Sequence, residues 1–438
     1  MFGDKRVWIA VGAVLAVVII AFASTWTCNH FFGEDDLYAL GISDKVLMDK
    51  DATDSGIKEM VHAHNQFAID LYLELANGSE KNIFFSPFSL FTALMMTYEG
   101  ARGNTADEMA EVMHLPINDD QRRAAFASVQ NDLNGREGRV KLNIANSLWM
   151  QKDYQFKQEF LEVLEDYYFS EAFVTDLGGD QEGSREAINQ WVSKNTEKRI
   201  PELLPLGSFD QWTKAVLVNA LYFKGDWATE FDVDRTGEEP FYIDRFNYVQ
   251  AEMMHTDPDA EDTAFRVNWD QRSTVLELPY KGDKISMVAF LPEIPEMVVN
   301  ANIHNLENIL DAKTMADMIE GLEEQDIQVS MPKFQFESEY MVSQPLQRLG
   351  MRDAFVYPTA DFTGISDQSS LFIDEVYQDT FINVDETGTE AAAATAVVMK
   401  DERVATSVDL NRPYIFTIQD RETGLILFMG RIMDPSKM

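Results

Sequence analysis

Side chains that could carry out catalysis or hold a metal are few in this chain, and their spacing is unfavourable. Of the 6 histidines, His62 and His64 form the closest pair, within a segment of helical periodicity. Two histidines on one helix share a zinc ion when they are about four positions apart, so we interpret this pair as two polar helix positions. The chain contains no Gly-x-Ser-x-Gly elbow, phosphate-binding loop, dinucleotide fingerprint or Cys-His pair. We therefore expect no enzymatic activity, no metal site and no cofactor.

A more informative stretch runs from 385 to 397 and reads Asp-Glu-Thr-Gly-Thr-Glu-Ala-Ala-Ala-Ala-Thr-Ala-Val. No proline follows it before Pro413. On strand parity, one face is small near its start and apolar further on, and it holds Thr389, Ala391, Ala393, Thr395, Val397 and Met399. The segment could therefore join a sheet in one state and be exposed in another. Because alanine is the best helix former, a small-residue helix or a linker fits the same residues.

The chain of 438 residues has a formal net charge of −38, and its acidic residues are spread along its length. This length allows one large domain or up to about three small ones, with a substantial core. Nucleic acid is not expected as a partner, because phosphate binding needs clustered basic residues and the body of the chain has only two adjacent pairs, Arg122-Arg123 and Lys198-Arg199. With Cys28 as the single cysteine, no internal disulfide can form, so the fold must depend on packing.

The amino-terminal segment predicts export. Lys5-Arg6 precede an uncharged run from 7 to 32, and about 20 apolar residues suffice to span a bilayer as a helix. The basic pair orients the following domain to the outside. We expect residues 1–32 to be a signal peptide cleaved near Ala21-Phe22-Ala23 or an uncleaved membrane anchor, and a lipid-modified Cys28 is a third alternative. Each alternative leaves the protein exported, either secreted or anchored at the cell surface.

Residues 33–56 are polar and acidic, which predicts a tether, and the periodic elements begin at 57. Helical periodicity predicts helices over 57–75, 87–100, 104–113, 119–133, 155–167, 183–197, 302–320 and 340–350. Runs typical of strands occupy 140–150, 215–223, 273–278, 285–291, 327–331, 381–384, 414–419 and 425–432. Helices and strands are mixed without strict alternation, and no linker or repeat divides them. We therefore predict one α+β domain from 57 to 438.

Several blocks of this domain together resemble one known family. Residues 82–90 (NIFFSPFSL), 93–105 (ALMMTYEGARGNT) and 216–227 (VLVNALYFKGDW) are similar to the second helix, the third helix and the central strand of the serpins, a family of protease inhibitors. Further matching blocks are 331–334, 360–365, 385–397 and 428–435. The resemblance extends in order over about residues 57–436. It implies a serpin fold with three β-sheets, eight or nine helices and an exposed reactive-centre loop.

The resemblance implies suicide inhibition of a serine protease by a monomer without a cofactor. The protease attacks the loop and forms an acyl-enzyme, and the freed loop then inserts as a new central strand of the main sheet. The residues that match the hinge of that loop are Glu386, Thr387, Gly388, Thr389, Glu390, Ala391, Ala392, Ala393 and Ala394. Their inward face carries no bulky, charged or proline residue, which favours an inhibitor. The alternative is a non-inhibitory serpin that acts as a binding or chaperone-like surface protein.

The scissile bond can be placed by counting along the resemblance. About sixteen residues forward from Glu386 and about eleven back from Pro413 both reach Glu402. We therefore predict cleavage between Glu402 and Arg403 by a protease specific for Glu or Asp. A shift of one residue would place the bond between Arg403 and Val404, with a trypsin-like target.

Other positions match family sites more weakly. Ser86, Ser89, Asn219 and Gln378 match the shutter, a polar cluster beneath the main sheet, and Trp227 matches the breach where the loop first enters. The family often has histidine at the position of Gln378, and glutamine cannot titrate, so no pH-dependent shutter is implied. Ordinary core packing is the alternative for each position.

The helix that matches the family's heparin-binding element contains Arg122 and Arg123 as its only basic residues, among three aspartates. No heparin-type activator is therefore expected.

Overall fold

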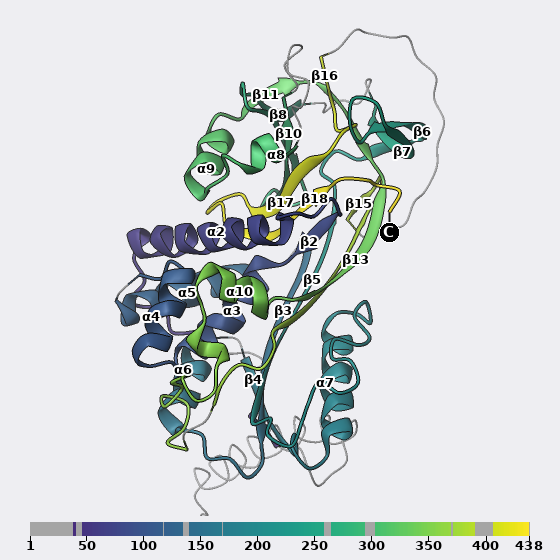
Figure 1. Ribbon diagram of the computed structural model, residues 1–438. Coiled ribbons are helices and arrows are strands. Elements are labelled where there is room, and N and C mark those ends of the chain that lie inside the picture. Colours follow the sequence, from purple (N-terminus) through teal and green to yellow (C-terminus); the bar gives the residue numbers. More distant parts are fainter. Residues whose placement is uncertain are drawn as a thin grey trace, which may run out of the picture.

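The computed structural model describes residues 38–40, 46–116, 118–134, 140–168, 170–257, 264–293, 303–368, 371–389 and 406–437. Within these ranges the chain forms three sheets. The helices are α2 (Asp54–Ala76), α3 (Pro87–Tyr98), α4 (Gly103–Val112), α5 (Asp119–Asn134), α6 (Gln158–Tyr167), α7 (Gln181–Asn195), α8 (Ile303–Glu307), α9 (Ala312–Glu320) and α10 (Ser343–Leu349), with a short 3-10 helix at Asp353–Phe355. This confirms the expected α+β architecture of the serpin fold (Figure 1).

Sheet A is the long sheet. Its strands, in spatial order, are β1 (Tyr38–Leu40), β4 (Ser170–Thr175), β3 (Val140–Gln151), β5 (Ala215–Asp226), β15 (Gly388–Thr389), β14 (Tyr377–Val384) and β13 (Phe334–Met341). Figure 1 shows its long strands between α7 on one side and α3, α5 and α6 on the other. The face toward α7 is apolar, with Trp149 stacked on Phe173 at 4.3 Å between ring centroids and Trp191 of α7 beside them. On this face α7 covers β3, β4 and β5, whereas alternate residues of β13 remain exposed or half-buried.

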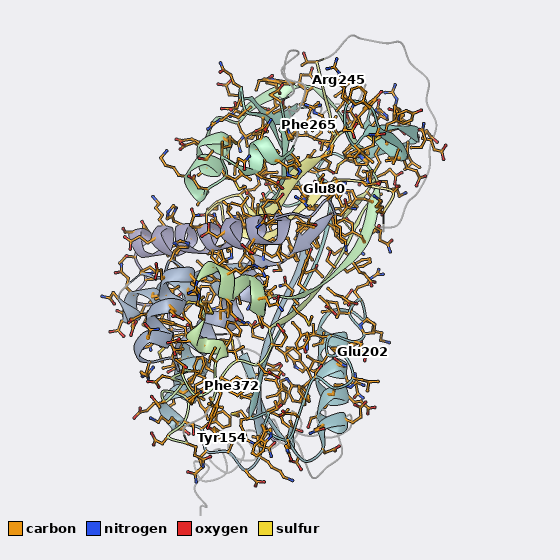
Figure 2. The ribbon with its side chains drawn as sticks, in the orientation of Figure 1. Glu80, Tyr154, Glu202, Arg245, Phe265 and Phe372 are labelled. Atoms are coloured by element: carbon orange, nitrogen blue, oxygen red, sulfur yellow. The ribbon has the colours of Figure 1, made fainter. Side chains whose placement is uncertain are left out.

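Sheets B and C occupy the other end of the molecule. Sheet B has the order β11 (Glu323–Asp326), β8 (Ala264–Trp269), β9 (Ser273–Pro279), β10 (Ile285–Pro292), β17 (Tyr414–Asp420), β18 (Ile426–Ile432) and β2 (Ile83–Phe85). Sheet C has the order β16 (Ser407–Asp409), β12 (Gln328–Pro332), β7 (Tyr248–Thr256) and β6 (Phe231–Tyr242). Figure 2 shows the side chains that fill these layers, with Phe265 toward the end formed by sheets B and C and Tyr154 toward the opposite end.

The hydrophobic core explains why several strands were recognisable as apolar runs. Every residue of β10, β17 and β18 is buried, as expected for strands covered on both faces. Phe84 of β2 stacks on Phe428 at 5.2 Å and meets Phe336 of β13 edge-on at 6.3 Å. This ring contact joins sheet B to sheet A beneath α3.

Local capping determines where the first helices begin. Thr53 Oγ1 accepts a hydrogen bond from the Gly56 amide at 3.1 Å and starts α2. Ser86 Oγ accepts from the Ser89 amide at 3.2 Å, and Pro87 occupies the first turn of α3, as the sequence predicted. These two side-chain caps satisfy amides that the helices themselves leave free.

Three sequence predictions were wrong in detail. The predicted helix over 302–320 is two helices, because Asp311 caps α9 by accepting from the Thr314 amide at 2.6 Å. Of the predicted helix over 340–350, the first two residues belong to β13. His62 is an exposed polar position as predicted, whereas His64 is buried against Phe91, and burial lowers the pKa of its imidazole to about 4.

The amino-terminal predictions fall largely outside the described residues. Residues 1–37 and 41–45 are not described, so the segment 1–32 and part of the tether 33–56 have no structural test. Within 33–56, β1 pairs with β4, and Leu47 is buried and donates its amide to Asn131 at 2.9 Å. Within the described ranges no helix is both long and apolar enough to cross a bilayer.

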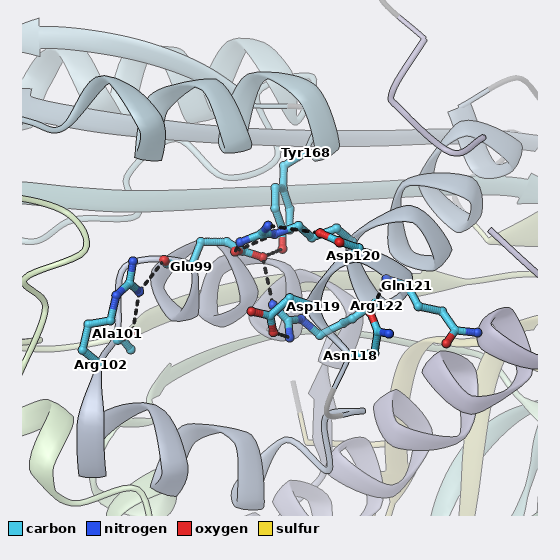
Figure 3. Close-up of polar contacts among 10 residues, drawn as sticks. Glu99, Ala101, Arg102, Asn118, Asp119, Asp120, Gln121, Arg122 and Tyr168 are labelled. Carbon is cyan, nitrogen blue, oxygen red and sulfur yellow. Dashed lines mark hydrogen bonds and ion pairs between the residues drawn. The ribbon is translucent and has the colours of Figure 1, made fainter. Parts of the chain in front are cut away.

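A buried ionic network joins α3 to α5 (Figure 3). The Glu99 carboxylate, 1% exposed, accepts from Arg122 at 3.3 Å, from Arg123 at 2.5 Å and from the Tyr168 hydroxyl at 2.8 Å. Arg122 is itself 1% exposed and also contacts Asp119. The Glu99 carboxylate is thus the buried partner of both arginines of α5, and Asp119 is a second, exposed partner of Arg122.

Replacing Glu99 by glutamine should leave Arg122 buried beside a neutral amide, with the exposed carboxylate of Asp119 as its remaining charged partner. We expect Glu99→Gln to lower the free energy of unfolding by about 3 kcal/mol, the usual cost of breaking a buried ion pair from one side. A guanidinium titration measures this. The control is Glu422→Gln, which breaks the exposed pair with Lys284 and should cost less than about 1 kcal/mol. Equal losses for the two variants would contradict a structural role for the network.

Candidate functional site

The sequence-predicted hinge begins inside sheet A. Gly388 and Thr389 form β15, which lies between β5 and β14 and runs antiparallel to both. Thr389 pairs with Val384 on one side and with Gly225 on the other. A turn over Asp385–Thr387 reverses the chain, with the Asp385 amide donating to Gly388 O at 2.9 Å. The first two residues after the turn are therefore already a strand in the middle of the sheet.

Below β15 the two neighbouring strands are not paired with each other. In the part of the chain that the structure describes, β5 pairs with β3 and β15, and β14 pairs with β13 and β15. β15 takes up only the Gly225–Asp226 end of β5 and the Val384 end of β14. Among the described residues the rest of both facing edges has no strand partner, and an unpaired strand edge can pair with an added strand.

The turn before β15 is held by hydrogen bonds on both sides. Asp385 Oδ1 accepts from the Thr387 amide at 3.0 Å and the Gly388 amide at 3.2 Å, an Asx-type turn. Trp227 donates its backbone amide to Thr387 O at 2.8 Å and its indole nitrogen to Asp385 O at 3.0 Å. The Phe231 amide donates to Glu386 O at 2.8 Å. The turn thus has a defined shape before the loop begins.

Glu386 is the charged residue of this turn, and it is 5% exposed. Its carboxylate accepts from Lys333 Nζ at 3.0 Å. Burial raises the pKa of the Glu386 carboxyl, but hydrogen bonds from its own amide and from Lys333 outweigh that effect and hold it below the usual range. The ion pair ties the turn to the chain between β12 and β13, so its negative charge has a fixed partner.

Two aromatic rings lie under the start of β15. Trp227, the predicted breach residue, is 1% exposed and stacks on Tyr280 at 4.5 Å between centroids. The Tyr280 hydroxyl and Thr389 Oγ1 are hydrogen bonded at 2.8 Å. The sequence analysis did not identify Tyr280, because a tyrosine after a buried strand carries no distinctive pattern. The structure brings it, Trp227 and the hinge together.

Gly388 is at a position where only glycine fits. A Cβ added to it would lie 2.2 Å from Gly225 O and 2.7 Å from the Asp226 Cα, both backbone atoms of β5. The backbones of β15 and β5 approach too closely there for any side chain. The glycine is thus required for β15 to occupy its place.

The predicted shutter residues also meet in space. Gln378 of β14 donates Nε2 to Ser86 O at 2.8 Å and accepts the Ser86 amide at 3.1 Å. Ser86 Oγ donates to Leu427 O at 2.9 Å and caps Ser89. Asn219 pairs with Asn146 across β5 and β3, and its side chain is not among those described. Gln378 therefore fastens the start of β14 to the start of α3.

The predicted reactive bond lies outside the described residues. Glu402, Arg403 and Val404 belong to the undescribed range 390–405, as do the hinge residues Glu390 and Ala391 to Ala394. The described chain stops at Thr389 in sheet A and resumes at Thr406, just before β16 in sheet C. The range 390–405 thus connects two different sheets.

No group of three or more metal-binding side chains occurs in the described ranges.

An acidic cluster lies on β13 and β14, on the face of sheet A toward α7. Asp379 of β14 is directly opposite Glu339 of β13, and Glu337 is the next residue along that face. Burial, and then the like charges of Glu339 and Glu337, raise the pKa of Asp379 to about 7. In contrast to Gln378 beside it, Asp379 can change charge near neutral pH.

Asp379 should make stability depend on pH. Its pKa in the folded protein, about 7, is above the ordinary 3.8, so the folded state holds an extra proton between these values. Stability from this group is therefore complete below pH 3.8 and is lost as the pH rises through 7. We expect Asp379→Asn to gain stability relative to the parent between pH 5 and pH 8, measured as thermal midpoints across this range. Glu339→Gln removes one like charge, so this loss of stability should occur at lower pH. If the thermal midpoints of the parent and of Asp379→Asn change in parallel with pH, Asp379 is not the cause of the pH dependence.

Replacing Gly388 should displace β15 from the sheet. In Gly388→Ala the added carbon meets the backbone of β5, so we expect faster hydrogen exchange at the amides of residues 387–389 by at least about tenfold. Mass spectrometry of the exchanged peptide measures this. Gly237→Ala is the matched control, because a Cβ there meets no atom within 4 Å. Unchanged exchange at 387–389 in Gly388→Ala would show that β15 is not held by this close approach.

Comparisons with known proteins agree with this geometry. The family model described as "Serpin (serine protease inhibitor)" matches residues 62–435. A serpin-like protein of Thermococcus kodakarensis is 38% identical over 384 residues, 86% of each chain. The human leukocyte elastase inhibitor is 35% identical over 388 residues, which cover 86% of this chain and 100% of that one. The crystal structure of tengpin, a thermophilic serpin in its native state, matches with a TM-score of 0.75 and 27% identity over 90% of this chain and 96% of that one. This chain belongs to the serpin family, which is described as a family of serine protease inhibitors and not of enzymes.

Proposed function

We propose that this protein inhibits a serine protease by a suicide mechanism, in which the protease cleaves the loop 390–405 and the cut loop extends β15 into sheet A. The observation that carries this proposal is the place of β15, antiparallel to both β5 and β14, whose remaining facing edges are not paired with each other in the described residues. Each new backbone hydrogen bond contributes about 1 kcal/mol net, so a strand of about a dozen residues is a large driving force.

The register of β15 supports the same proposal. Thr389 pairs with Val384 and with Gly225, so each following loop residue would meet the preceding residue of β14 and of β5. Continued in this way, both counts place Thr395 opposite a shutter residue, Gln378 on β14 and Asn219 on β5. The polar loop residue would thus arrive at the polar cluster. Between Thr389 and Thr395 only alanines would face the core, and they demand little space.

The class of the target protease follows from the residue that precedes the scissile bond. Glu402–Arg403 is the proposed scissile bond, with a Glu- or Asp-specific protease as target, and Arg403–Val404 with a trypsin-like protease is the alternative. Residues 1–32 would export the domain as a signal peptide or membrane anchor, with 33–56 as the tether to the serpin domain 57–438. A heparin-type activator is not part of the proposal, because Glu99 engages both arginines of α5.

The proposal predicts a covalent complex. Incubation with a Glu-specific protease should give a band at the summed mass on a denaturing gel, and a separate incubation with a trypsin-like protease tests the alternative bond. Mass spectrometry of the released carboxy-terminal peptide should find its first residue at Arg403. A peptide that begins at Val404 would move the bond to the alternative position. Cleavage without any covalent band would contradict inhibition and favour the binding or chaperone-like alternative.

A matched pair of hinge variants tests insertion itself. Thr389 is 3% exposed and faces the core, so Thr389→Arg should block insertion and convert the inhibitor into a substrate that is cleaved without a complex. Glu390→Arg places the same side chain on the opposite face by strand parity, and it should still form the complex. Loss of the complex in both variants, or in neither, would contradict insertion of the loop as a strand.

A further inference from the structure

The position of the Tyr280 ring is determined by sheets A and B and not by the hinge. Tyr280 follows β9, forms an isolated bridge with Trp227 and donates its amide to Ile285 O at 3.0 Å. Its ring stacks on Trp227 at an interplanar angle of 12° and meets Phe223 of β5 edge-on at 4.9 Å. The side chain is fully buried. Its hydroxyl therefore points to a fixed place under the joint between β5 and β15.

The Tyr280 hydroxyl depends on Thr389 for its hydrogen bond. In the described part of the chain its one hydrogen bond is to Thr389 Oγ1, at 2.8 Å. Burial raises the pKa of the Tyr280 phenol, so the group remains neutral and able to donate. A buried hydroxyl that loses its partner is costly, so withdrawal of Thr389 from the sheet would leave Tyr280 in an unfavourable state.

We propose that Tyr280 is a positioning residue for loop insertion: its hydroxyl holds Thr389 in β15, so the first step of insertion is already made before a protease cuts the loop. This inference rests on the proposed function, and it adds the residue that sets how far the hinge is inserted at rest.

The other contacts of the hinge act on different atoms. Lys333 binds the Glu386 carboxylate, and Trp227 binds the carbonyls of Asp385 and Thr387, all within the turn. Among the described side chains, Tyr280 alone is hydrogen bonded to the side chain of Thr389. Lys333 and Trp227 therefore hold the turn, whereas Tyr280 distinguishes a Thr389 that is in the strand from one that has left it.

The hydrogen bond also links insertion to the packing of sheet B. Gly225, the β5 partner of Thr389, lies against the Tyr280 ring, since a Cβ at Gly225 would be 2.8 Å from Tyr280 Cδ1. Tyr280 thus touches both strands at the point where the loop would begin to separate the sheet. A loop released by cleavage would continue from a residue that is already in register, without a search for its first partner.

Hydrogen exchange of the uncut protein tests the docking role without any protease. Removal of one buried hydrogen bond should shift the equilibrium between Thr389 inside and outside β15 by about tenfold. The amides of residues 388–389 should therefore exchange about ten times faster in Tyr280→Phe than in the parent. Thr389→Val removes the same bond from the other side, and the double variant should not exceed the larger single effect. Tyr414→Phe is the control, because Tyr414 is also buried and its hydroxyl has no hydrogen-bond partner among the described residues. It should leave exchange at the hinge unchanged.

The second measurement is how the acyl-enzyme divides between covalent complex and cleaved inhibitor. Because Thr389 is in β15 less of the time in Tyr280→Phe, this variant should give several-fold more cleaved inhibitor per covalent complex than the parent. Tyr414→Phe should give the same ratio as the parent. Thermal melting confirms that both variants are folded.

Unchanged exchange in Tyr280→Phe overturns the inference, and so does faster exchange with an unchanged division of products. If the parent forms no complex with any protease, the proposed function fails, and the exchange experiment alone then decides whether Tyr280 holds the hinge.

Discussion

The facing edges of β5 and β14 are the constraint on which the rest of the structure depends. Backbone amides and carbonyls inside a sheet require partners, and a strand edge without them is costly. Among the described residues, only Gly388 and Thr389 lie between these two strands, at one end. The segment that can supply the missing strand belongs to the same chain and is joined at its far end to β16 in sheet C. Under the proposed function, cutting the connection to sheet C would free this segment to complete the sheet.

Other contacts keep β5 and β14 from pairing with each other before a strand inserts between them. Gln378 fastens β14 to the start of α3 through two hydrogen bonds with Ser86, so β14 cannot shift toward β5 without breaking them. On the opposite face, α7 packs its apolar side on β3, β4 and β5. At the top, the turn of residues 385–387 is held by Trp227, Phe231 and Lys333. The contacts of Gln378 and of the turn are thus hydrogen bonds and an ion pair, whereas α7 holds its face of the sheet by apolar packing.

The sequence predicted the parts of the fold that local chemistry determines. The Ser-Pro cap of α3, the apolar runs of β10 and β17, and the turn between β17 and β18 were found at their observed positions. It missed β13, whose outward glutamates interrupt the apolar pattern, and it missed the burial of His64. For the site, the resemblance identified Trp227, Ser86 and Gln378, but Tyr280 could not be found. Its role comes from a contact with a residue more than a hundred positions away, which no local pattern encodes.

Two neighbouring residues of β14 also show where a change of pH can alter the charge of sheet A. Gln378 and Asp379 are neighbours on β14 and point to opposite faces, the first toward Ser86 in the core and the second toward α7. Because glutamine does not titrate, protons cannot loosen the contact between β14 and α3. Asp379 does titrate near neutrality, and it faces Glu339 and Glu337 across the β13–β14 ladder. Above its pKa three like charges lie together on that pair of strands, so a rise in pH weakens the ladder on the far side of β14 from the hinge. Near neutral pH, the effect of Asp379 on sheet A should therefore pass through β13 and not through the shutter.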